Sequence, residues 1–97
     1  MAMERIPGNV RRREAFKGPT GLARFFRGDR LEVIPRRDAD RRACLEYLAL
    51  RFERGRDYPE LEVNSLLLAA HDDVAMIRRY LVDAGLLHRA NNVYRRA

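Results

Sequence analysis

The chain has 97 residues, enough for one domain around a single hydrophobic core and too few for an elaborate buried active site. It is 46% apolar and 35% charged, and it contains neither a membrane-length apolar run nor the apolar stretch of a signal peptide, so we expect a cytoplasmic protein with no membrane partner. The net charge of +6 suggests a nucleic-acid partner, and the single cysteine excludes an internal disulfide.

The excess of positive charge lies in the first third of the chain. Residues 1–37 carry ten basic and four acidic side chains, whereas residues 38–97 carry ten of each. Residues 1–19 contain two adjacent pairs of proline and glycine and few apolar residues, and we expect a flexible basic arm there. The arm contains three consecutive arginines, Arg11, Arg12 and Arg13. They are candidates for phosphate contacts, and a solubilising tail is the other interpretation.

Residues 20–37 are expected to form a linker that packs on the domain. Thr20 can cap a short helix over "GLARFF", which Gly28 would end. The run "RLEVI" is typical of an extended segment, stopped by Pro35. The apolar side chains that would anchor the linker are Phe25, Phe26 and Ile34.

The first long helix is predicted over residues 38–55. Asp38 or Asp40 can accept hydrogen bonds from the free amides of its first turn, and Gly55 stands where a left-handed cap belongs. Apolar residues at helical spacing form its buried face: Cys44, Leu45, Leu48 and Phe52.

A second helix is expected after a brief extended connection, "RDY", at residues 56–58. Pro59 suits the opening turn of this helix because its missing amide hydrogen is no loss there. Its buried stripe consists of Val63, Leu66, Leu67 and Ala70. Asn64, on the side of the helix, is a candidate for a local hydrogen bond to a turn, with a base contact as the alternative.

A third helix follows the turn "AHDD", where Asp72 or Asp73 would cap it. Its apolar face contains Val74, Ile77, Leu81 and Ala84. Gly85 would take the left-handed position after the helix, and Leu86 would contact Leu81 in a Schellman ending.

Two strand-like runs, "LLHR" and "VYRR", complete the chain and flank "ANN", which suits a tight hairpin turn. Three helices followed by a hairpin is the order of a winged helix. We therefore predict an α+β, mainly α fold: a winged helix-turn-helix at residues 38–97, with three helices and a C-terminal β-hairpin wing, preceded by the basic N-terminal extension.

Several fragments together resemble one family: "FFRGDRLEVIPRR", "LEYLALRFERGRDYPELEVN", "HDDVAMIRRYLVDAGLLHR" and the final "YRR". They are similar to a prokaryotic family called domain of unknown function 2087, over roughly residues 25–96. The resemblance implies a domain that occurs alone or joined to helix-turn-helix transcription regulators, without a catalytic motif. The chain departs from the family where an aromatic pair is expected and Tyr94 is followed by Arg95. The arm lies outside the resemblance.

The outward face of the third helix is close to neutral. It contains Met76 and Arg79 beside aspartates, whereas recognition helices usually offer basic or amide side chains to bases. Arg78 should lay its stem along the core, which leaves Arg79 as the helix's best base or phosphate contact. The hairpin is expected to add a basic cluster of Arg89, Arg95 and Arg96, and Arg36 and Arg37 precede the first long helix.

These residues favour a transcription regulator that binds duplex DNA through the third helix, the wing and the arm. The hairpin arginines could equally form a solvated strand edge. The alternative function is a non-enzymatic winged-helix module for protein interaction, oligomerisation or effector sensing, with a protein partner or a second copy of the chain.

An enzyme is not expected. Cys44, His71 and His88 have no metal-ligand spacing, and no phosphate loop or serine nucleophile motif occurs. We therefore predict no cofactor and no metal.

Overall fold

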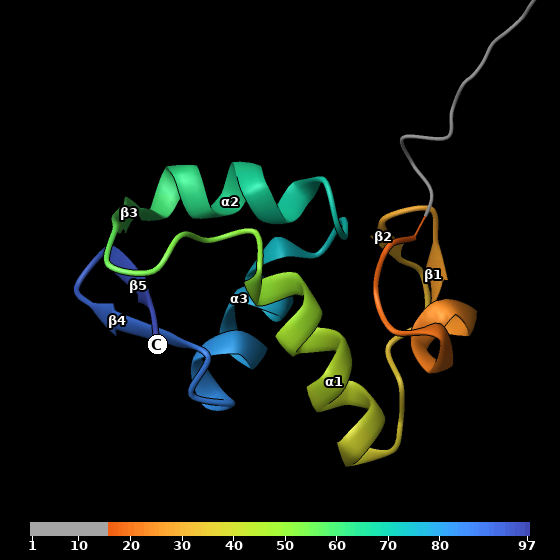
Figure 1. Ribbon diagram of the computed structural model, residues 1–97. Helices are drawn as coiled ribbons and strands as arrows, with labels where there is room; N and C mark the ends of the chain where they lie inside the picture. The colour runs from red at the N-terminus through yellow and green to blue at the C-terminus, as the bar shows by residue number, and fades with distance from the viewer. Residues whose placement is uncertain (1–15) are drawn as a thin grey trace, which may run out of the picture.

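The computed structural model describes residues 16–97, so the predicted phosphate contacts Arg11, Arg12 and Arg13 lie outside the described residues. The described part is a small α+β fold with four helical segments and two small antiparallel sheets (Figure 1). Its elements are the 3₁₀ helix η3 (Thr20–Phe25), β1 (Phe26–Arg27), β2 (Arg30–Leu31), α1 (Asp38–Ala49), β3 (Asp57–Pro59), α2 (Glu60–Leu68), α3 (Val74–Asp83), β4 (Leu87–Ala90) and β5 (Val93–Arg96).

The larger sheet contains three strands in the order β3-β5-β4. The hairpin β4–β5 forms as predicted, with Ala90 opposite Val93 and a tight turn in which Asn91 has a φ of 57°. Strand β5 also pairs with β3, so that Tyr58 lies opposite Tyr94. The sequence predicts β3 only as an extended connection, because its pairing partner lies far along the chain.

Helix α1 is shorter than predicted. It ends at Ala49. Hydrogen bonds of the tighter 3₁₀ type follow, and in one of them the Phe52 amide donates to the Ala49 carbonyl at 3.1 Å. This turn keeps Phe52 buried while redirecting the chain towards β3. Gly55 has the expected positive φ, 79°, but it lies in the connection and not at the helix end.

The predicted capping of α1 by Asp38 or Asp40 is wrong. No side chain caps this helix. Asp38 instead pairs with Arg41, and Asp40 pairs with Arg24 of η3. Both carboxylates still lie in the first turn, where their charge suits the positive end of the helix dipole.

Both ends of α3 form as predicted. Asp73 is the cap, and its Oδ1 accepts a hydrogen bond from the Met76 amide at 3.1 Å. At the other end, the Leu86 amide donates to the Leu81 carbonyl at 2.9 Å. Gly85 has a φ of 75° between them, which completes a Schellman ending. These two signals fix where α3 begins and stops.

One hydrophobic core joins all the larger elements. The largest of its fully buried side chains are Leu48, Phe52, Tyr58, Leu67, Ile77, Leu81, Leu87 and Tyr94. In Figure 1 the three-stranded sheet lies on one side of α1 and the segment with η3, β1 and β2 on the other. The arrangement leaves one side of α3 and one face of the hairpin free to form a shared surface.

The N-terminal segment packs on this core through Leu22, Phe26 and Leu31. The Leu31 amide donates to the Ala70 carbonyl at 2.8 Å, and Phe16 stacks on Phe26 with ring centroids 4.6 Å apart. The last residues of the predicted arm thus contact the domain.

Two local predictions for this segment are wrong. Pro19, not Thr20, occupies the cap position of η3, and no side chain caps it. Gly28 does not end the helix, because Phe25 already ends it. Gly28 instead lies between the paired strands β1 and β2 with a φ of 58°.

Candidate functional site

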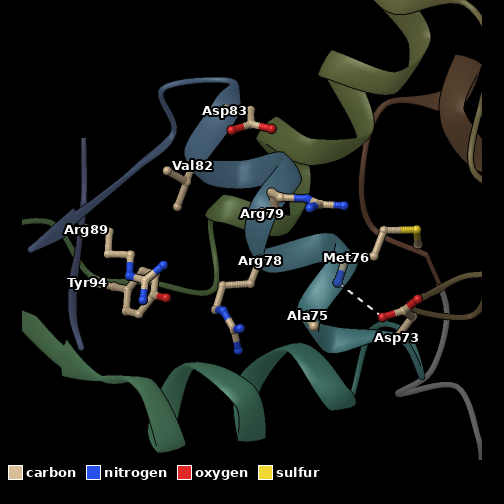
Figure 2. Close-up of a pocket in the computed structure, with 9 residues that line it drawn as sticks. All are labelled: Asp73, Ala75, Met76, Arg78, Arg79, Val82, Asp83, Arg89 and Tyr94. Atoms are coloured by element: carbon tan, nitrogen blue, oxygen red, sulfur yellow. Dashed lines mark hydrogen bonds between the residues drawn. The ribbon is translucent and has the colours of Figure 1, made fainter. Parts of the chain in front are cut away.

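A hollow of about 530 Å³ lies between α3 and the hairpin β4–β5, and we call it the α3–hairpin hollow (Figure 2). Helix α3 and its cap residue Asp73 supply most of the lining, and the hairpin supplies the rest. The lining residues are Asp73, Ala75, Met76, Arg78, Arg79, Val82, Asp83, Arg89 and Tyr94. The hollow therefore contains three arginines and two aspartates, and it is open to solvent.

Helix α3 presents successive turns of its outer face to the hollow. Ala75 and Arg79 are exposed one turn apart, and Figure 2 shows the guanidinium of Arg79 extending away from the helix. Met76 is half-buried at the edge of this face and packs against the core. Of the two predicted contacts on α3, Arg79 is therefore free to reach a partner, whereas Met76 offers only part of its side chain.

A hydrogen-bonded network forms the floor of the hollow. Arg78 donates to Asn64 Oδ1 at 2.5 Å and lies 4.0 Å from Glu60 Oε2. The other oxygen of Glu60 accepts the hydroxyl hydrogen of Tyr94 at 2.7 Å. The network connects α2, α3 and β5, so the two walls of the hollow are held at a fixed spacing.

The surroundings of Tyr94 stabilise the protonated form of its hydroxyl. Burial, and then the hydrogen bond to Glu60, raise the pKa of the Tyr94 hydroxyl above its usual value of 10. The local hydrogen bond to a turn expected for Asn64 is wrong: its Oδ1 instead accepts from Arg78 of α3, 14 positions later in the chain. The pairing of Glu60 with Tyr94 is missed from the sequence because 34 residues separate them.

Arg89 approaches the hollow from the hairpin. It lies opposite Tyr94 across the strand pair, so both side chains are on the face of the sheet turned towards α3. Its guanidinium carbon is 5.7 Å from the centre of the Tyr94 ring, and its Nε donates to the Asn91 carbonyl at 2.8 Å. These contacts hold the stem of an exposed arginine and leave its two terminal nitrogens available.

Ion pairing separates the free arginines from the others. In residues 16–97, nine arginines lie within 4.0 Å of a carboxylate: Arg24, Arg27, Arg30, Arg41, Arg42, Arg51, Arg56, Arg78 and Arg95. The other six described arginines form no ion pair with a described carboxylate: Arg36, Arg37, Arg54, Arg79, Arg89 and Arg96. Of these six, only Arg79 and Arg89 line the hollow. Asp73 in the same hollow is engaged as the α3 cap. Arg79, Arg89 and Asp83 are therefore the charged side chains of the hollow that have neither an ion-pair partner nor a capping role within residues 16–97.

The expected cluster of three hairpin arginines is wrong. Arg95 lies opposite His88 on the other face of the sheet, where its Nε and one terminal nitrogen each lie 2.8 Å from Asp57 Oδ1. Arg96 is half-buried and donates to the Phe52 carbonyl at 3.2 Å. Strand alternation and the unforeseen pairing with β3 account for the difference, because β3 supplies Asp57 to Arg95. Only Arg89 of the three lines the hollow.

Arg36 and Arg37 are exposed directly before α1 and do not line the α3–hairpin hollow. They border a separate depression of about 360 Å³ with Phe25, Val33 and Ile34. Asp72, in the turn before α3, pairs with Arg30 at 2.6 Å. One of the two negative charges at that helix end is therefore balanced.

Cys44 lies in the core and His71 in the turn before α3. Burial raises the pKa of the Cys44 thiol to about 11, and this side chain is fully buried. His71 Nδ1 accepts a hydrogen bond from the Asp73 amide at 2.9 Å, a local role in the turn before α3. Across residues 16–97 no three histidine, cysteine or acidic side chains come together as a metal-binding group. No helix of the described part is long and apolar enough to cross a membrane.

Comparison with known proteins gives a family. No curated protein and no solved structure matches the chain. One family model, described as "Uncharacterized protein conserved in bacteria (DUF2087)", matches residues 30–96, which include α1 to β5 and the whole α3–hairpin hollow. Because the match spans more than half of the 97 residues, the chain belongs to this bacterial family.

Proposed function

We propose that residues 38–97 form a winged helix-turn-helix domain that binds duplex DNA and serves as a transcription regulator without enzymatic activity. The order α1, β3, α2, α3, β4, β5 with the strand order β3-β5-β4 supports this interpretation. In such domains the second helix of the helix-turn-helix, here α3, enters the major groove. The hairpin β4–β5 would then be the wing, lying along the DNA backbone.

The observation that carries the proposal is the pair Arg79 and Arg89. They come from different elements, line the same hollow and have no carboxylate partner in the described part, whereas nine other arginines do. Two arginines without a carboxylate partner in the described part, one from a helix and one from a hairpin, suit a polyanion whose groove admits a helix. The major groove is about 12 Å wide and admits one helix.

The two arginines would have different roles. Arg79 projects from the middle of α3 and would reach a base edge, where arginine pairs best with guanine, or a neighbouring phosphate. Arg89 is anchored by Asn91 near the hairpin turn and would contact phosphate. Ala75 and the exposed part of Met76 add small apolar contacts. Arg36, Arg37 and the arginines Arg11 to Arg13 would extend the phosphate contacts beyond the hollow.

A salt titration with matched variants tests the proposal. The affinity for a pool of genomic DNA fragments is measured at several salt concentrations for the wild-type protein, Arg79→Ala, Arg89→Ala and Arg95→Ala. Each lost phosphate contact reduces the slope of log affinity against log salt by about 0.9. We expect this reduction for Arg89→Ala and weaker binding for Arg79→Ala.

Arg95→Ala is the control, because Arg95 is a hairpin arginine paired with Asp57 on the opposite face of the sheet. It should bind as the wild type does. Equal losses for Arg95→Ala and Arg89→Ala would contradict the proposed surface, and no binding at low salt would refute DNA binding altogether.

A second candidate function is a protein-interaction or effector-sensing module that uses the same hollow. The presence of Asp73 and Asp83 beside the three arginines favours it, because the lining then carries a net charge of only +1. A partner captured from cell extract and lost on Met76→Glu, in a protein that does not bind DNA, would support this function. Retention of the partner by Met76→Glu would contradict it.

A further inference from the structure

The Asp83 carboxylate in the α3–hairpin hollow has no partner in the part of the chain that the structure describes. Of the acidic side chains in residues 16–97, all but three lie within 4.0 Å of an arginine. The three are Asp73, which caps α3, Glu53, which is exposed between α1 and β3, and Asp83. Asp83 is exposed and lines the hollow, whereas Glu53 does not.

Asp83 also stands where a carboxylate weakens a helix. It is the last residue of α3, at the negative end of the helix dipole, and the last turn contains no basic residue. The other end signals of α3, Asp73 and Gly85, follow the usual rules for helix ends. A residue that breaks such a rule without a compensating contact is typical of a functional position.

Asp83 follows Arg79 by one helical turn, about 6 Å along the axis at 1.5 Å per residue. With the arginine first, this spacing is the less favourable order for an ion pair, and the two side chains form none. Figure 2 shows the Asp83 carboxylate and the Arg79 guanidinium apart from each other. Helix α3 therefore offers a hydrogen-bond donor and an acceptor side by side.

A phosphate backbone does not suit this combination, because phosphate offers only acceptors and its charge repels Asp83. Base edges in the major groove offer both donors and acceptors. Guanine presents two acceptors there, thymine presents one acceptor, and adenine presents an acceptor beside its donor. Cytosine presents only the donor of its N4 amino group. A carboxylate, which can only accept, therefore matches cytosine best.

We propose that Asp83 is a specificity-determining residue that accepts a hydrogen bond from the N4 amino group of a cytosine while Arg79 donates to a guanine. This inference rests on the proposed function, in which α3 enters the major groove. Base pairs are stacked about 3.4 Å apart, so the two bases lie within about two base pairs of each other. Asp83 weakens binding to every other sequence, and its role is discrimination.

Selection of bound duplexes from a random pool at low salt tests the inference with the full chain. The wild-type protein should enrich a guanine and a cytosine at this spacing. Asparagine pairs with adenine, so Asp83→Asn should keep the guanine and exchange the cytosine for adenine. Glu53→Gln is the matched control, because it removes the same charge outside the hollow, and it should select the wild-type sequence.

Affinities for one selected duplex measure the contact directly. Replacing its cytosine by thymine, with the partner base changed to match, puts an acceptor where the donor was. Wild-type affinity should fall at least about fivefold, the lower end of the usual loss for one wrong base pair. Asp83→Asn should lose less, because its amide can donate to thymine. Without DNA, Asp83→Asn should have a higher Tm than the wild type, because a negative charge leaves the C-terminal end of α3.

The outcomes separate this inference from the proposed function. DNA binding without a cytosine preference, or the same selected sequence for Asp83→Asn and the wild type, overturns the inference and leaves DNA binding intact. A lower Tm of Asp83→Asn also overturns it, because the carboxylate would then stabilise the fold. A protein that binds no DNA refutes both and leaves the hollow to a protein partner.

Discussion

Replacing Tyr94 by phenylalanine tests the network beneath the α3–hairpin hollow. The substitution removes one hydroxyl, whose hydrogen bond to Glu60 is 2.7 Å long, and leaves the ring, which is 1% exposed, in place. A hydrogen bond to a charged group contributes about 1.5–3 kcal/mol. Glu60 keeps Arg78 at 4.0 Å and its side chain is 30% exposed, so water can replace part of the lost bond. We therefore expect the low end of this range, a loss of about 1.5 kcal/mol in the free energy of unfolding.

Urea and thermal denaturation measure this loss. For a domain of this size, about 1.5 kcal/mol corresponds to a decrease in Tm of about 6–12 °C. Tyr80→Phe is the control, because Tyr80 is half-buried on α3 and its hydroxyl has no hydrogen-bond partner within residues 16–97. Equal stability of Tyr94→Phe and the wild type, or an equal loss in Tyr80→Phe, would refute the role given to the network.

Three further predictions concern the ends of α3 and the pH dependence of stability. Asp73→Ala removes the cap of α3 and should lower the free energy of unfolding by about 1 kcal/mol. Asp72→Ala removes only an exposed ion pair and should lower Tm less. Equal changes in Tm would contradict the assignment of Asp73 as the cap. Gly85→Ala should lower the free energy of unfolding by about 1 kcal/mol, because Gly85 has a φ of 75°. Gly21→Ala is the control: an added Cβ there would have no atom within 4 Å, and Gly21 has no positive φ, so the stability of this variant should not fall. An unchanged stability of Gly85→Ala would be inconsistent with the Schellman ending. Burial raises the pKa values of Cys44, Tyr47 and Tyr94 in the folded protein, so the unfolded chain loses these protons first. The stability that they contribute is complete below pH 9.0, the ordinary pKa of a cysteine thiol, and is lost as pH rises through the folded pKa values. Urea unfolding at successive alkaline pH values should show this loss, and a rise in stability there would contradict the sign of the three shifts.

Local signals predict much of this fold from the sequence. Asp73, Gly85 and Leu86 act within a few residues of the helix end that they define, and the hairpin turn at Asn91 depends on a single residue tolerating positive φ. The end of α1 is less accessible, because Phe52 continues the helical spacing although the backbone has already left the helix. Burial alone therefore does not define the end of that helix.

The candidate site depends on contacts that no local pattern encodes. Strand β3 has three residues, and its pairing with β5 determines that Arg95 meets Asp57, 38 positions earlier in the chain. Likewise Arg30 reaches Asp72 across 42 positions. Counting charges along the chain cannot distinguish these paired arginines from Arg79 and Arg89. Of the three arginines predicted to form a basic cluster on the hairpin, the structure therefore places only Arg89 in the hollow beside α3.

Nuclear magnetic resonance provides the most direct test of DNA binding through the α3–hairpin hollow. Backbone amide signals of the ¹⁵N-labelled protein are followed while a short duplex is added at low salt. The proposed function predicts that the largest shifts fall in residues 74–83 and 88–92, with the outer face of α2 unaffected. Shifts confined to residues 1–37, or no shifts in α3 and the hairpin under conditions where DNA binds, would contradict it.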